Sequence, residues 1–236
     1  MTLTPALRDA LAGVTTATLT TVLLKKGVRS CYIRGARPLV PGTAGRRVVG
    51  PAFTLRFTPA REDLATVESW SSPRSTRAAI EEMPEGCVAV ADAMGVSDAG
   101  IFGDILCARM AKRGVAGLVT DGMVRDGAGV IATGLPVFCQ GHVAPASVAS
   151  LNFVGWQETI GCGGVTVVPG DTIVADADGA VVIPAALAEA VAEAAVEQER
   201  LEAWIMREVE KGARLPGLYP PNAETRARYE AETKRG

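Results

Sequence analysis

The sequence predicts an α/β fold, a single-domain α/β sandwich built around a central sheet, and two patterns support this. Apolar strand-like and helical segments alternate between residues 87 and 140, which is typical of parallel strands joined by crossover helices. The apolar runs CVAVA and GLVT indicate strands buried on both faces. The composition agrees, because 48% of the residues are hydrophobic and only 5% are aromatic, which suits helices packed on strands.

Two short helices are expected before the sheet. A threonine precedes each of these segments and can accept a hydrogen bond from the first free N–H groups, and a glycine follows each one. The predicted helices span residues 5–12 and 17–26.

The middle of the chain contains the alternating segments. Helices are expected where apolar residues recur at helical spacing, and strands where short apolar runs lie between turn residues. The predicted strands are 48–57, 87–91, 116–120 and 136–140, and the predicted helices are 75–83, 105–113 and 127–133.

The last third predicts short strands and then a long helix. Strands are expected at 165–168, 172–175 and 180–183, the last two joined by a turn with the hairpin signal Asp178-Gly179. Pro184 is expected to open a long C-terminal helix over 184–212, which Gly212 closes. Residues 213–236 are predicted to form an extended arm. Because no repeat or break in composition appears, residues 1–236 are predicted to be a single domain.

Charge and cysteine content exclude several functional classes. The net charge is −2 and the basic residues are scattered, so no nucleic-acid partner is expected. The N-terminus lacks the apolar core of a signal peptide, and no run is long enough to span a membrane, so we expect a cytoplasmic protein without a membrane partner. With one histidine and five scattered cysteines, any metal is expected to be bound by oxygen.

The segment from Gly103 to Gly129 contains the candidate site. In an α/β sheet the segments after the strand ends form the ligand crevice, and here they contain Asp92, Gly103, Asp104, Asp121, Arg125 and Asp126. Gly103 lets a ligand approach the free N–H groups of a helix start, and Arg125 can bind a carboxylate through two hydrogen bonds. Asp126 offers a hard oxygen ligand for Mg²⁺ or Mn²⁺.

These residues also have purely structural interpretations. Asp126 and Asp104 can each be the N-cap of the helix that follows, and Arg125 can form a surface ion pair. The spacing leaves both interpretations open.

A resemblance favours the functional interpretation. The run GD-x-L with an A-x-x-x-G helix, followed by a strand that ends in DG-x-x-RD, resembles the RraA-like family. That family includes 4-hydroxy-4-methyl-2-oxoglutarate aldolases that also decarboxylate oxaloacetate. The resemblance extends from TTATLTTVL at Thr15 to the VVIP strand at Val181. It implies an α/β sandwich related to swivelling phosphohistidine domains, assembled as homotrimers or homohexamers with the active site near a subunit interface.

The resemblance also assigns roles to residues. The backbone loop that binds substrate falls on Gly103, Asp104, Ile105 and Leu106, the carboxylate-binding arginine on Arg125, and the metal ligand on Asp126. A glutamate of a neighbouring subunit's C-terminal helix completes the site in the aldolase branch, and here Glu199 or Glu202 would take that part. The substrate is then a small 2-oxo acid, cleaved to pyruvate with Mg²⁺ or Mn²⁺ as cofactor, and Asp104 or the glutamate steers the catalytic base.

Two other functions stay open. The second branch of the family consists of regulators that bind and inhibit RNase E, and those proteins are typically shorter, without the C-terminal extension. A related reaction on a sugar-derived 2-oxo acid is also compatible with these residues. A Schiff-base aldolase is disfavoured, because the lysines lie on predicted helices or near the termini.

Overall fold

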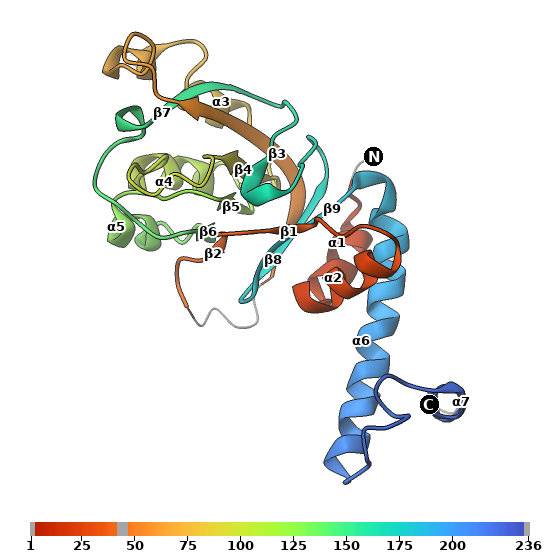
Figure 1. The fold of residues 1–236 in the computed structure, drawn as a ribbon. Helices are drawn as coiled ribbons and strands as arrows, with labels where there is room; N and C mark the ends of the chain where they lie inside the picture. The colour runs from red at the N-terminus through yellow and green to blue at the C-terminus, as the bar shows by residue number, and fades with distance from the viewer. Residues whose placement is uncertain (1–2, 42–46, 234–236) are drawn as a thin grey trace.

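The computed structural model describes residues 3–41 and 47–233. Its strands are β1 Tyr32–Ile33, β2 Arg37–Pro38, β3 Val48–Pro59, β4 Val88–Asp92, β5 Gly117–Thr120, β6 Val137–Cys139, β7 Leu151–Trp156, β8 Thr172–Asp176 and β9 Gly179–Ile183. They form a mixed sheet in the order β1, β9, β8, β3, β4, β5, β6, β2, with β7 paired to β3 (Figure 1). The predicted α/β fold with a central sheet is confirmed.

The helices agree closely with the capping signals. They are α1 Pro5–Ala12, α2 Thr16–Lys25, α3 Thr76–Glu82, α4 Asp104–Lys112, α5 Gly127–Ala132, α6 Ala188–Glu210 and α7 Ala223–Thr233, with short 3₁₀ turns η1 Val67–Ser71, η2 Ser147–Ala149, η3 Cys162–Gly164 and η4 Ala185–Leu187. Thr4 Oγ1 accepts the N–H of Leu7 at 3.2 Å, and Thr15 Oγ1 accepts that of Thr18 at 3.1 Å. Both threonines therefore cap helices as predicted.

Strand β3 links the two halves of the sheet. Its first part pairs antiparallel with β8, its middle pairs parallel with β4, and its end pairs antiparallel with β7. Strands β4, β5 and β6 are parallel to one another, as the alternating pattern predicts. Val88 and Val90 face one apolar cluster, and Ala89 and Ala91 face another. The run CVAVA is therefore buried on both faces.

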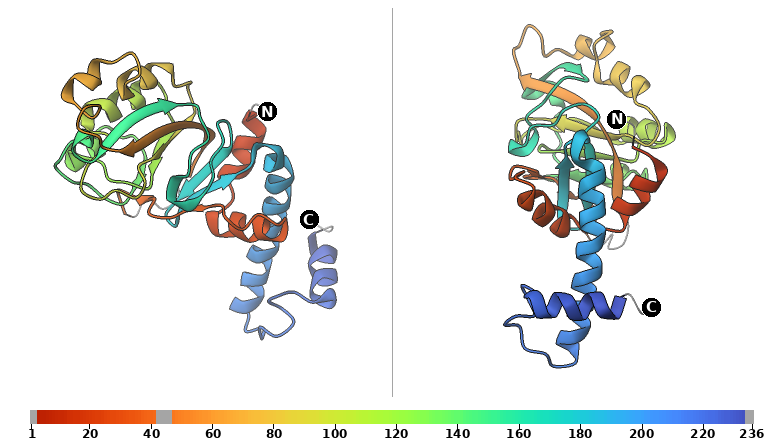
Figure 2. Two further views of the ribbon diagram at one scale, coloured as in Figure 1. Left: turned by 45° about the horizontal axis from the view of Figure 1, so that its top comes forward. Right: turned by 90° about the vertical axis from the view of Figure 1, so that its right-hand side faces the viewer.

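Helices cover the outer faces of the two halves. Helices α3, α4 and α5 pack on the β4–β5 side, whereas α1, α2 and the first turns of α6 pack on β8 and β9. Between the two halves lies a third apolar cluster from the inner faces of both. Figures 1 and 2 show α4 and α5 on one side of the body and α6 on the opposite side. No helix within the described ranges is long and apolar enough to cross a membrane.

In the last third, one predicted strand is wrong and one strand was not predicted. Residues 165–168 form no strand, only an isolated bridge between Ile160 and Val167, because the N–H of Val168 donates to Asp171 Oδ2 and Pro169 has no N–H to pair. Strand β7 was not predicted, since its sequence LNFVGW does not alternate; it forms by pairing with β3 beside a register shift after Arg56.

The long C-terminal helix is confirmed, but the extended arm is not. Helix α6 starts at Ala188, after the 3₁₀ turn η4, and projects from the body (Figure 1). Instead of an extended arm, the tail contains α7, which folds back against the far end of α6 (Figure 2). Trp204 and Tyr229 meet edge to face with ring centroids 5.8 Å apart, and both are buried. The prediction of an extended arm is wrong because the buried ring of Tyr229 packs on Trp204 and keeps the tail against α6.

Tyr229→Ala should release α7 from α6. The change removes the aromatic contact and the hydrogen bond from Tyr229 Oη to Glu197 Oε1 (2.9 Å), and truncating a buried aromatic side chain costs about 3 kcal/mol or more. Limited proteolysis should then cut within residues 211–222 much faster than in the wild type. Tyr229→Phe keeps the ring and should stay close to wild type; equal cleavage of all three proteins would show that α7 is not held by this contact.

Candidate functional site

The loops that follow β4, β5 and β6 run side by side. Short parallel bridges join Gly100 to Met123, Gly100 to Ala146, and Val124 to His142. A Cβ atom on Gly100 would lie 2.7 Å from the carbonyl carbon of Val124, so only glycine permits this approach. As a result the starts of α4 and α5 lie next to each other.

These loops and the start of α3 enclose a pocket of about 350 Å³. All six residues of the predicted site on these loops line it, namely Gly103, Asp104, Ile105, Leu106, Arg125 and Asp126. The remaining lining residues are Trp70, Thr76, Arg77, Gly100, Ile101, Ala146 and Ser147. The structure therefore brings two arginines and two carboxylates together in one cavity.

The start of α4 presents its backbone to this pocket. Gly103 is the N-cap and Asp104 is the first helical residue, so Asp104 does not cap the helix. Asp104 Oδ1 accepts the N–H of Ile105 at 2.7 Å. The N–H of Leu106, by contrast, has no hydrogen-bond acceptor within the described residues. A Cβ on Gly103 would lie 2.8 Å from Asp126 Oδ2. A side chain at this position would therefore have to displace the carboxylate of Asp126.

Asp126 occupies the N-cap position of α5, as the structural alternative expects, but its side chain does not cap the helix. Its φ of 55° and ψ of 47° lie in the left-handed region, which aspartate adopts more readily than most residues, at a cost of order 1 kcal/mol. The side chain makes no capping hydrogen bond and is 50% exposed. Capping therefore does not occupy this carboxylate, which is accessible to a cation.

Arg125 is anchored by its backbone rather than by its side chain. Its N–H donates to the carbonyl of Phe102 at 2.9 Å. Its Nε lies 3.6 Å from Asp126 Oδ2, too far for a hydrogen bond, and this buried Nε has no hydrogen-bond partner among the described residues. Such a half-exposed ion pair contributes little stability. The guanidinium therefore has donors left for a ligand carboxylate.

The pocket is suited to a hard divalent cation. Within the described part of the chain, no cluster of three or more histidine, cysteine or acidic side chains could hold an ion alone. The pocket supplies two carboxylates instead, Asp104 and Asp126. Mg²⁺ is commonly held by one or two protein carboxylates, with water and substrate oxygens completing its shell. The donor set therefore fits Mg²⁺ or Mn²⁺ better than zinc.

The structure does not bring Glu199 and Glu202 to this pocket. Both lie on α6, on the opposite side of the body (Figure 1). Glu199 Oε1 accepts the N–H and the Oγ1 proton of Thr15, each at 2.8 Å, and Glu202 accepts from Gln198 at 2.7 Å. Burial works to raise the pKa of Glu199, but the donors from Thr15 and Thr18 and the charge of Arg47 together outweigh it and hold the pKa below its ordinary value. A role in a neighbouring subunit's site stays a prediction.

Asp92 and Asp121 line a separate, more open pocket of about 560 Å³. Asp121 is buried and accepts the N–H groups of Ala93 and Gly163 at 2.8 and 2.9 Å. Burial raises the pKa of this carboxyl, although the two N–H donors oppose the shift. The predicted crevice is thus divided in two, and Asp121 connects loops rather than facing the pocket of Arg125.

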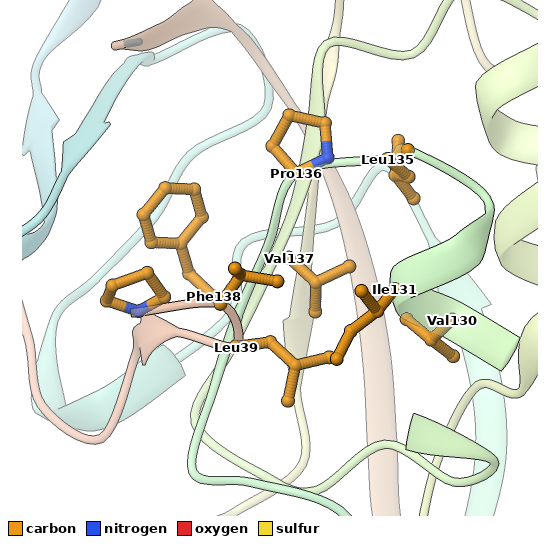
Figure 3. Close-up of a pocket in the computed structure, with 10 residues that line it drawn as sticks. Leu39, Val130, Ile131, Leu135, Pro136, Val137 and Phe138 are labelled. Carbon is orange, nitrogen blue, oxygen red and sulfur yellow. The ribbon is translucent and has the colours of Figure 1, made fainter. Parts of the chain in front are cut away.

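A third pocket is apolar. It measures about 180 Å³ and lies between β6, β2 and α5, lined by side chains such as Leu39, Ile131 and Phe138 (Figure 3). No titratable side chain of the described residues lines it. It therefore offers no group for acid, base or metal chemistry.

Part of the pocket lining was not among the site residues predicted from the sequence. Trp70 and Arg77 come from η1 and α3, and Ser147 comes from η2. An aromatic and an arginine seven residues apart form no recognisable motif. The capping Ser75 was the one local signal that a helix starts here.

Comparisons with known proteins find matches over most of the chain. Residues 4–182 match the RraA-like family model, described as Aldolase/RraA. A protein of Halalkalibacterium halodurans, provisionally named 4-hydroxy-4-methyl-2-oxoglutarate aldolase, is 33% identical over 77% of this chain and 72% of its own length. Protein DlpA of Legionella pneumophila is 31% identical over 66% of this chain, which spans only 24% of DlpA.

A solved structure extends the likeness to the fold. RraAS2 of Streptomyces coelicolor, described as an unusual member of the RNase ES inhibitor RraA protein family, superposes with a TM-score of 0.76 at 35% identity, covering 86% of this chain and 97% of that one. The family model covers well over half of the sequence. The chain therefore belongs to the RraA-like family.

Proposed function

We propose that this protein is a divalent-metal-dependent lyase that releases pyruvate from 4-hydroxy-2-oxo acids such as 4-hydroxy-4-methyl-2-oxoglutarate and also decarboxylates oxaloacetate. One observation carries the proposal: Arg125, the start of α4 and Asp126, whose side chain caps no helix, share one pocket. The relatives that are provisionally named as aldolases support it.

Substrate binding follows from the donors in the pocket. Arg125 has unpaired N–H donors and α4 offers the free N–H of Leu106, so both favour the carboxylate next to the keto group of a 2-oxo acid. Asp126 would hold Mg²⁺ or Mn²⁺ beside that carboxylate. The bound cation supplies Lewis-acid stabilisation of negative charge on the keto oxygen, an effect worth several kcal/mol.

Aldol cleavage needs one proton transfer at the hydroxyl group. A base removes the proton of the C4 hydroxyl, the C4–O bond becomes a carbonyl, and the C3–C4 bond breaks with its electron pair left on the pyruvate enolate. Protonation at C3 then yields pyruvate. We assign the base to a water molecule steered by Asp104 or by the partner glutamate, Glu199 or Glu202.

Decarboxylation of oxaloacetate passes through the same enolate. The bond between C3 and the distal carboxylate breaks, carbon dioxide leaves, and the electron pair again remains on the enolate. No hydroxyl proton has to be removed. One site can therefore serve both reactions, with different demands on its acidic residues.

A Schiff-base mechanism has no support in this pocket. Such a mechanism requires a lysine whose amine is activated next to the substrate. None of the described pocket residues is a lysine. The acidic and arginine side chains instead favour an enolate mechanism.

The assembly forms part of the proposal. Glu199 and Glu202 lie on α6, on the other side of the body from the pocket of their own chain, so either would reach an active site from a neighbouring subunit. A homotrimer or homohexamer would provide such a contact. The projecting α6 and α7 are the elements available to reach across.

A regulator of RNA processing is the second candidate function. The likeness to RraAS2, over 86% of this chain, supports it. Such a regulator would act through its surface and would need neither a divalent cation nor Arg125. Dependence of pyruvate release on a metal therefore separates the two functions.

Pyruvate release should depend on a divalent metal, on Arg125 and on Asp126. Purified protein with Mg²⁺ or Mn²⁺ should release pyruvate from oxaloacetate well above the rate of the metal alone, and EDTA should abolish the release. Arg125→Ala and Asp126→Ala should each lower kcat/KM by about 100-fold or more, since they remove a charged substrate or metal contact. A coupled lactate dehydrogenase assay measures this. Activity that survives EDTA, or that both variants retain, would contradict the proposal.

A second prediction separates the two reactions. Asp104→Asn and Glu202→Gln should reduce cleavage of 4-hydroxy-4-methyl-2-oxoglutarate about tenfold more than decarboxylation of oxaloacetate, because only cleavage needs a base. The ratio of kcat values for the two substrates measures this in one preparation. Glu193→Gln, an acidic residue exposed on the same helix as Glu202, serves as the control. Equal losses in both reactions would remove the assigned base role.

A further inference from the structure

One wall of the pocket carries a second arginine. Arg77 lies in the first turn of α3, and its Cζ is 5.1 Å from the centroid of the Trp70 ring. Both residues line the pocket that also contains Arg125. An arginine stacked on an aromatic face is held in place while the edge of its guanidinium keeps its donors.

Arg77 has no acidic partner in the described part of the chain. No carboxylate there lies within 4 Å of its guanidinium. Arg74, three residues earlier, differs in that it lies 4.0 Å from Glu158 and donates to the carbonyl of Val154. A positioned cation without an anion, on the wall of a ligand pocket, is suited to bind a negatively charged ligand group.

The pocket has room beyond the pyruvate unit. A neighbouring chamber of about 280 Å³ shares Trp70, Thr76 and Ser147 with the pocket of Arg125. The cleft therefore continues past the Trp70 wall. Together the two chambers fall within the usual range for ligand pockets, about 300–1,000 Å³.

We propose that Arg77, stacked on Trp70, binds a second carboxylate at the end of the substrate remote from Arg125. Two arginines that line one pocket, one from α3 and one from the loop before α5, match a molecule with two carboxylates joined by a short carbon chain. The inference deepens the proposed function and rests on it for the orientation of the substrate. It makes Arg77 a specificity residue that selects 2-oxo dicarboxylates over 2-oxo monocarboxylates of the same length.

A binding experiment tests this without turnover. Isothermal titration in Mg²⁺ compares 2-oxoglutarate with 2-oxopentanoate, which has a methyl group in place of the distal carboxylate. The wild type should prefer the dicarboxylate by about tenfold or more, the value of one charge-assisted hydrogen bond. Arg77→Gln should reduce this preference to about one, and Arg77→Lys should restore part of it.

Arg61→Gln is the control. It removes the same charge from the segment that leads to α3, at an exposed residue that is paired with Asp63 and lines neither chamber. It should keep the wild-type preference. The inference is overturned if Arg77→Gln retains the preference, or if Arg61→Gln loses it equally, since the effect would then come from net charge and not from a contact with Arg77.

An activity measurement distinguishes this inference from the proposed function. The ratio of kcat/KM for 4-hydroxy-4-methyl-2-oxoglutarate to that for 4-hydroxy-4-methyl-2-oxopentanoate should fall about tenfold in Arg77→Gln. Absence of pyruvate from either substrate, with the Arg77-dependent binding preference intact, would refute the lyase and uphold the carboxylate site. Pyruvate release with selectivity independent of Arg77 would uphold the lyase and refute this inference.

Discussion

The close approach of two loops at Gly100 and Gly103 is the constraint on which the site depends. Any side chain on Gly100 would overlap the backbone between Val124 and Arg125, and any side chain on Gly103 would meet the carboxylate of Asp126. These contacts bring the start of α4 against the start of α5. Asp126 adopts a left-handed conformation beside these contacts, and its carboxylate does not cap the following helix. The strained residue and the glycine that faces it therefore form one structural unit.

The sheet makes this approach possible. Parallel pairing of β4, β5 and β6 places their carboxyl ends at one edge, so the loops that follow leave in the same direction. The bridges between those loops extend the pairing beyond the strands. Buried Asp121 helps by accepting N–H groups from two different loops. Of the acidic residues at this edge, Asp121 therefore supports the loops, whereas Asp104 and Asp126 line the ligand pocket.

The geometry of the pocket bears on the choice between the two candidate functions. A surface that binds only another protein does not need an aspartate in a left-handed conformation whose side chain caps no helix. That conformation costs of order 1 kcal/mol in the free protein. A cation bound at the carboxylate would offset this cost, so the geometry of Asp126 favours the proposed lyase over a regulator.

The sequence by itself determined the local features: the capped helices, the apolar strands, and the positions of Gly103, Asp104, Arg125 and Asp126 at strand ends. These could be predicted because hydrogen-bond capping and hydrophobic periodicity act over a few residues. Only the tertiary structure decided that β7 pairs with β3, that α7 folds back on α6, and that Trp70 and Arg77 form a wall of the pocket. The tertiary structure also places Asp92 and Asp121 in a different pocket, and it brings Glu199 to Thr15, which donates a hydrogen bond to its carboxylate. Such contacts join residues far apart in the chain, where no local spacing records them, and they form only when the packed core brings the elements together.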